Sequence, residues 1–84
     1  MADLARSIIV ARRIKAARKA RDWSQDRLVE ALAEHGYRIT KNTYCTKETG
    51  RRPQISVDLL TAASHALDIP VTTLLGLDDE HPTP

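Results

Sequence analysis

The chain has 84 residues, which is enough for one modest hydrophobic core and too few for an enzyme with a separate substrate domain. It is rich in aliphatic residues and alanine, has no Phe and a single Trp, and so favours packed helices over a sheet. A formal net charge of +2 excludes neither acidic nor basic partners, and no apolar run approaches the roughly 20 residues of a membrane span. We therefore expect an all-α, cytoplasmic protein without a membrane segment.

The charges are segregated along the chain. Residues 1–52 hold all 13 Lys and Arg residues and six of the acidic residues, whereas residues 53–84 hold the other five acids and no base. Such a basic part is typical of a surface that binds a polyanion, although a solvated helix surface explains it equally well. The lone Cys45 cannot form an internal disulfide, which is compatible with a reducing compartment.

The first predicted helix covers residues 3–21. Apolar side chains recur there at intervals of three and four residues, and basic residues fill the other faces, as in an amphipathic helix. The predicted inner positions are Leu4, Ile8, Ala11, Ile14 and Ala17. Trp23, just beyond this helix, is expected to pack in the core.

A second helix is predicted to begin after Ser24, which is a good N-cap residue, and to bury Leu28, Ala31 and Leu32. Gly36 is expected to stop it in a left-handed conformation. Alternatively, Ala33 to Arg38 extend this helix by about one turn. In that case Tyr37 and Ile39 are expected to anchor the following loop to the core.

Thr40 is the N-cap candidate for a third helix, which extends to about Glu48 and is closed by Thr49 and Gly50. Tyr44 is its only clearly apolar residue. Because a helix this polar is poorly suited to a core, the sequence predicts that it is presented to a polar partner.

Two further helices are predicted after the basic loop at 51–54. Ser56 caps the first, which turns Leu59, Leu60, Ala63, Ala66 and Leu67 inward and ends before Pro70. The last covers about Thr72 to Leu75 and ends at Gly76. We therefore predict a compact bundle of about five helices over residues 1–77, followed by an acidic tail or linker stub at 78–84.

Several of these segments resemble one family when taken in order. The stretches from Ile14 to Arg18 and from Trp23 to Leu28, with its Trp-Ser-Gln-Asp entry, are similar to the first two helices of the xenobiotic-response-element, Cro and phage-repressor type of helix-turn-helix regulator. The stretch from Thr40 to Pro53, with its Glu-Thr-Gly-Arg-Arg-Pro exit, resembles the recognition helix of that family and the loop after it. The resemblance implies a lambda-repressor-like domain that binds double-stranded DNA as a homodimer to regulate transcription, with repression as the expected effect.

Under this resemblance the third helix enters the major groove and its polar side chains reach base edges. The predicted base contacts are Lys41, Asn42, Thr43, Cys45 and Thr46. The predicted phosphate contacts are Gln25, Lys47, Arg51 and Arg52. Lys47 departs from the family pattern, which is usually apolar there, and its methylene stem is expected to cover the core. Arg18 and Glu48 match a family ion pair with a structural role.

Two other functions would fit the same fold, namely an antitoxin that also neutralises a toxin and a protein-interaction module without an operator. The stretch Ile69 to Leu77 could form a dimer interface or close the core. The histidines His35, His65 and His81 show no metal-ligand spacing with Cys45, and no nucleophile and base pair or glycine-rich phosphate loop is present, so we expect no enzyme, metal or cofactor. The sequence does not identify a small-molecule effector.

Overall fold

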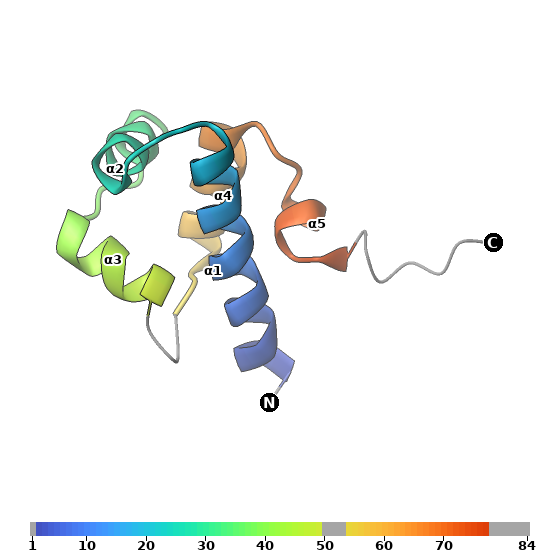
Figure 1. Ribbon diagram of the computed structural model, residues 1–84. Helices are drawn as coiled ribbons and strands as arrows, with labels where there is room; N and C mark the ends of the chain where they lie inside the picture. Colours follow the sequence, from blue (N-terminus) through green and yellow to red (C-terminus); the bar gives the residue numbers. More distant parts are fainter. Residues whose placement is uncertain (1, 50–53, 78–84) are drawn as a thin grey trace.

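A computed structural model describes residues 2–49 and 54–77, with side chains described from Arg6 onward. The described residues form five helices and no strand, which confirms the all-α prediction. The helices are α1 (Ala2–Ala20), α2 (Gln25–Glu34), α3 (Lys41–Thr49), α4 (Val57–Leu67) and α5 (Val71–Leu74). In Figure 1, α2 and α3 lie on one side of α1 and α5 lies on the other, while α4 packs behind α1.

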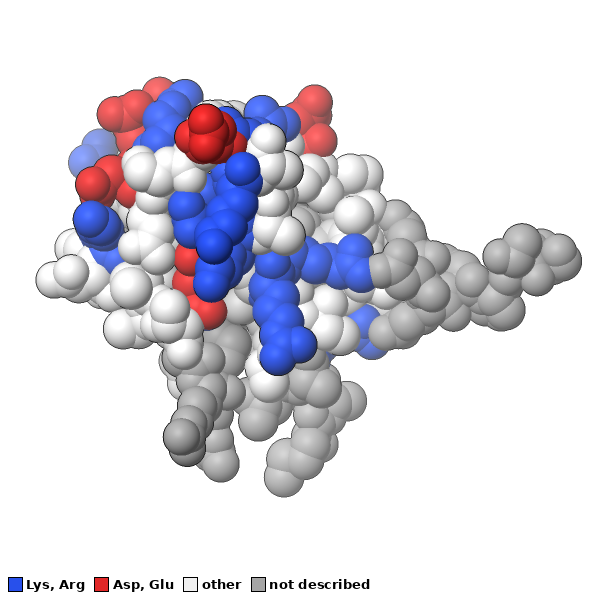
Figure 2. Space-filling view, in the orientation of Figure 1, with Lys and Arg blue, Asp and Glu red and all other residues white. Residues whose placement is uncertain are grey.

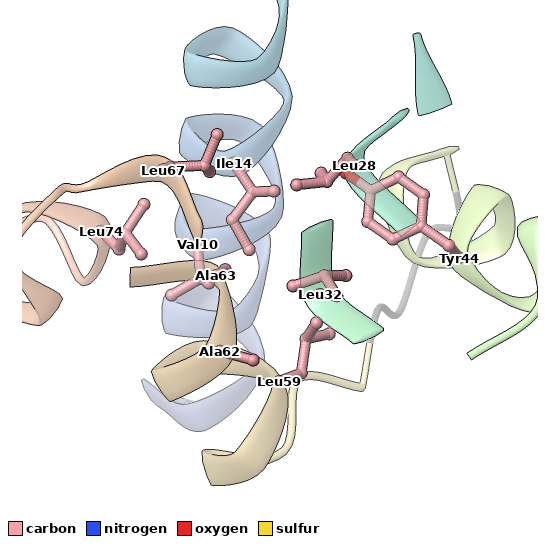
Figure 3. Close-up of a cluster of buried hydrophobic side chains, with 10 residues drawn as sticks. All are labelled: Val10, Ile14, Leu28, Leu32, Tyr44, Leu59, Ala62, Ala63, Leu67 and Leu74. Atoms are coloured by element: carbon pink, nitrogen blue, oxygen red, sulfur yellow. The ribbon is translucent and has the colours of Figure 1, made fainter. Parts of the chain in front are cut away.

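The core lies where all five helices meet (Figure 3). Tyr44, the only clearly apolar residue of α3, is buried. The buried apolar side chains are Val10, Ala11, Ile14, Leu28, Ala31, Leu32, Tyr44, Leu59, Ala62, Ala63, Leu67 and Leu74. Among the predicted inner positions, Ile8 is only half-buried, Ala17, Leu60 and Ala66 pack at the edge of the core, and Leu4 lies outside the described side chains. Val10 and Ala62 are also buried, although the apolar spacing did not predict them as inner positions.

The predicted N-caps are all confirmed. Ser24 Oγ accepts a hydrogen bond from the Arg27 amide at 3.0 Å, and Ser56 Oγ accepts one from the Leu59 amide at the same distance. Thr40 Oγ1 accepts one from the Thr43 amide at 3.2 Å. Each bond satisfies an N–H group that the first turn of the helix leaves unpaired, which is why α2, α3 and α4 begin where they do.

The expectation that α2 extends through Arg38 is wrong. The helix ends at Glu34, and Gly36 follows with a φ of +87°, as the glycine at this position predicted. The Tyr37 amide returns to the Leu32 carbonyl at 2.9 Å, which closes the helix with a Schellman motif. The residues between α2 and α3 therefore form a loop, and Tyr37 and Ile39 anchor it against the core, as expected.

The end of the described chain packs on α1. Leu74 is buried, and Ile69 and Leu75 pack against the core, so these apolar side chains close the bundle. Gly76 has a φ of +78° and would bring a Cβ atom within 3.0 Å of Ile9 Cγ2. The backbone at Gly76 therefore lies so close to α1 that a residue with a Cβ atom would not fit without a shift. The predicted tail at 78–84 lies outside the described residues.

Candidate nucleic-acid interface

The third helix divides into a buried side and an exposed polar side. Tyr44 points into the core, and the side chain of Glu48, one turn later on the same side of the helix, is also buried. Of the predicted base contacts, Lys41, Asn42, Thr43 and Thr46 are exposed and Cys45 is half-buried. The exposed side of α3 therefore consists of short polar side chains and one lysine.

The hydroxyl groups on this side are held by local bonds. Thr43 Oγ1 accepts a hydrogen bond from the Thr40 hydroxyl at 2.9 Å, and the Thr46 hydroxyl donates to the Thr43 carbonyl at 2.6 Å. The Asn42 amide, in contrast, makes no hydrogen bond to any described residue. Asn42 is therefore the α3 side chain whose donors and acceptor are both available to a partner.

A buried polar network fixes the position of α3. Arg18, on α1, donates from Nε to Glu48 Oε2 at 2.9 Å and from Nη2 to Glu48 Oε1 at 3.2 Å, which confirms the predicted ion pair. The Tyr44 hydroxyl also donates to Glu48 Oε2, and Gln25 Nε2 donates to Oε1 at 3.1 Å. The Arg18 and Glu48 side chains are only 10% and 2% exposed. Glu48 thus joins α1, α2 and α3 through one carboxylate.

The pKa shifts within this network have identifiable causes. Burial alone would raise the pKa of Glu48, but hydrogen bonds from Arg18, Tyr44 and Gln25 lower it overall. The hydrogen bond to Glu48 raises the pKa of Arg18. Burial, reinforced by the bond to Glu48, raises the pKa of Tyr44 far above its usual value. The network therefore contains one carboxylate, one guanidinium and one neutral phenol at neutral pH.

This arrangement predicts acid sensitivity. A carboxylate whose pKa is lowered by folding contributes stability that is complete above its unfolded pKa, near 4.5, and is lost as pH falls through the folded value. Wild type and Glu48→Gln should therefore differ most in melting temperature at neutral pH, and the gap should narrow below about pH 4.5. Thermal melts followed by circular dichroism between pH 7 and pH 3 measure it. A difference in melting temperature that does not change with pH would show that the charge of Glu48 does not stabilise the fold.

The start of α2 lies beside α3. Gln25, the first residue of α2, is half-buried and bonded to Glu48, so its amide is already oriented next to α3. Lys41 Nζ lies 3.5 Å from Asp26 Oδ2, and both side chains are more than half exposed. Because exposed pairs of this kind contribute little stability, Lys41 can exchange Asp26 for another acceptor at small cost.

Lys47 bridges α3 to the segment before α4. Its Nζ donates to the Gln54 carbonyl at 2.6 Å, and its side chain lies beside Ile14, Tyr44 and Ile55. Its half-buried side chain thus lies where a methylene stem can cover apolar residues. Its ammonium is occupied by a backbone carbonyl, so a phosphate would have to share or replace that bond. Arg51 and Arg52 lie outside the described residues.

Basic side chains also line α1 next to this site. Figure 2 shows Lys and Arg gathered over α1. Arg12, Lys15 and Lys19 recur at helical spacing, and none forms an ion pair with a described residue. Cations without acidic partners raise the local potential toward anions.

Sequence reasoning missed several members of the site. Nothing in the local pattern indicated that Tyr44 and Gln25 share the Glu48 carboxylate, or that Asp26 pairs with Lys41. The half-buried Trp23 packs against the core, as expected, and its ring also lies under two guanidinium groups, 5.3 Å from Arg21 and 4.6 Å from Arg27. The only sequence signal for the contacts of Trp23 with Arg21 and Arg27 is that all three side chains combine an apolar part with a polar group.

No family model, curated protein or solved structure matches this chain. Among the described helices, none combines the length and the apolar character that crossing a bilayer requires. The described part of the chain also contains no group of three or more His, Cys, Asp or Glu side chains placed to hold a metal ion.

Proposed function

We propose that the protein binds double-stranded DNA through α3 and regulates transcription. The observation that carries this proposal is the exposure of Lys41, Asn42, Thr43 and Thr46 on a helix held to the core by Tyr44 and Glu48. The B-DNA major groove accepts one α-helix, and short polar side chains on that helix reach the base edges. A polar helix that is held against an apolar core is suited to insertion into the major groove.

Each exposed side chain has a proposed partner in the groove. The Asn42 amide, which bonds to no described residue, can donate and accept at once, as bidentate pairing with an adenine edge requires. Lys41 can donate to a guanine edge after leaving Asp26. Thr43, Thr46 and Cys45 supply small groups for thymine methyls, base edges or phosphates. Asn42 is therefore the proposed principal base reader.

Phosphate contacts would supply most of the affinity. Gln25 stands at the first turn of α2, where unpaired backbone N–H groups also favour an anion. Lys47, Arg51 and Arg52 are proposed to contact the same backbone after α3. The cations of α1 add to a potential that attracts DNA from solution.

Repression and dimerisation belong to the proposal as well. A helix that occupies an operator competes with other proteins for that site, so repression is the simplest consequence. Two copies on a two-fold symmetric site would double the contacts and require half-sites about one helical turn apart. Leu74 is buried in the core, whereas Ile69 and Leu75 are only half-buried, so these two side chains and the half-buried Val71 and Leu77 remain candidates for a dimer surface.

Selection of bound duplexes from a random pool, followed by fluorescence titration at two salt concentrations, tests the proposal. We expect an enriched sequence motif and an affinity that falls steeply between about 50 and 200 mM salt, as expected for displacement of counterions from phosphates. No binding at low salt would refute DNA binding. Binding without an enriched motif would refute sequence-specific regulation.

Asn42→Ala and Arg52→Ala should fail in different ways. Loss of the Asn42 amide should cost about 1–3 kcal/mol on the selected site and little on a non-specific duplex, because only a base contact distinguishes the two. Loss of Arg52 should weaken both duplexes alike and reduce the salt slope by about one. Titrations of each variant against both duplexes measure these effects. Equal losses for Asn42→Ala on the two duplexes would exclude base reading by Asn42.

A further inference from the structure

Two histidines that are distant in the sequence meet on the surface between α2 and α4. The His35 and His65 rings are stacked, with centroids 5.9 Å apart and planes inclined by 20°. His35 caps the C-terminal end of α2, and His65 lies in the last turn of α4. Both residues are exposed, so the imidazole nitrogens are open to solvent and to ligands.

The pair lines a surface hollow of about 340 Å³. Gly36 and Tyr37 form one wall, and Asp58, Thr61 and Ala62 of α4 form the other. No described residue forms a hydrogen bond or ion pair with either imidazole. The Asp58 carboxylate on the same wall is also unpaired among the described residues and supplies negative charge. The hollow therefore combines two free imidazoles with an acid that favours a cation.

We propose that His35 and His65 together bind a borderline divalent transition-metal ion, with Zn²⁺ as the representative. Neutral imidazole is a common ligand for such ions, and each Zn–N bond is about 2.0–2.1 Å long. The stacked rings lie 5.9 Å apart, so both exposed side chains must turn toward each other for one nitrogen of each to bind a shared ion. Water would complete the coordination, and Asp58, which lines the same hollow, adds negative charge near the ion.

The site would tie the end of α2 to α4. These two helices already pack together, and Gly36 ends α2 next to His35. Because the unfolded chain does not hold the two imidazoles together, an ion that bridges them favours the folded state. The expected consequence is a protein whose thermal stability rises with Zn²⁺ but not with Mg²⁺, which prefers oxygen ligands.

Calorimetric titration of the full chain with Zn²⁺ tests this inference, alongside thermal melts with Zn²⁺ or Mg²⁺. We expect one Zn²⁺ per chain and a melting temperature raised by at least about 5 °C at a hundredfold excess over the dissociation constant. His35→Gln and His65→Gln should each weaken Zn²⁺ binding at least about tenfold, because removing one ligand ends chelation. His81→Gln is the matched control and should bind as wild type does.

Nuclear magnetic resonance of the imidazole nitrogens locates the ion independently of stability. The His35 and His65 signals should shift together during the titration, while those of His81 stay in place. Absence of binding heat, an equal loss in His81→Gln, or a Zn²⁺ response retained by the His35→Gln/His65→Gln double variant would overturn the proposal. In that case the two rings only stack. Because the test uses no DNA, its outcome is independent of the proposed function.

Discussion

Thr46→Glu should reduce affinity for the selected duplex at least about 100-fold, which corresponds to about 2.7 kcal/mol. Thr46 is exposed on the side of α3 that carries Asn42, and among the described residues its hydroxyl bonds only to the Thr43 carbonyl. A carboxylate there would enter a groove lined by phosphates, and such like-charge contacts cost several kcal/mol. Fluorescence titration at fixed salt measures the loss.

Thr72→Glu provides the matched control. Thr72 is also exposed and also lies on a helix, but α5 is on the side of α1 away from α3 (Figure 1). Thr72→Glu changes the net charge by the same amount as Thr46→Glu, so its effect on affinity measures the general repulsion between DNA and one added negative charge. Both variants should keep the wild-type circular dichroism spectrum. If the two variants bound equally well, α3 would not be the DNA-contacting helix.

Glu48→Ala should destabilise the fold by about 3–5 kcal/mol, the usual cost of leaving one partner of a buried ion pair uncompensated. Arg18 would retain its charge although its side chain is only 10% exposed, and the hydrogen bonds from Tyr44 and Gln25 to Glu48 would also be lost. In a domain of this size such a loss lowers the melting temperature by more than about 10 °C. Urea denaturation gives the free energy of unfolding.

Two companion variants separate the charge from the packing. Arg18→Met combined with Glu48→Leu removes both charges and should recover most of the stability, because well-packed apolar residues commonly replace buried pairs without loss. Tyr44→Phe removes only one hydrogen bond and should cost about 1 kcal/mol. A Glu48→Ala variant as stable as wild type would show that the carboxylate does not hold α3 in place.

The loss of Glu48 should also weaken DNA binding, although Glu48 itself does not face the groove. Its carboxylate sets the position of α3 relative to α1 and of Gln25 at the start of α2. The double variant separates the two effects, since it should be stable yet lack the oriented Gln25 amide.

Local chemistry along the chain was sufficient to predict most of the fold. Ser24, Thr40 and Ser56 begin helices because a side-chain oxygen satisfies an N–H group three residues later, an interaction confined to one turn. Gly36 ends α2 because glycine adopts a positive φ without steric cost. The polarity of α3 also predicted the exposure of Lys41, Asn42, Thr43 and Thr46, although the side chain of the equally polar Glu48 is buried.

Contacts between distant segments could not be predicted in this way. The ion pair between Arg18 and Glu48 joins residues thirty positions apart, and no local pattern within either helix requires it. The spacing allowed α2 to stop at Gly36 or to extend through Arg38, and the structure ends it at Glu34. His35 and His65 gave no spacing signal, yet folding brings their rings together.

The sequence alone thus determined where helices begin, which face of each is apolar and that α3 is polar, because these properties depend on neighbours within a turn or two. Only the tertiary structure decided that Arg18, Tyr44 and Gln25 share one carboxylate. Those partners come from three helices, and their meeting depends on how the apolar faces pack, which no local pattern encodes.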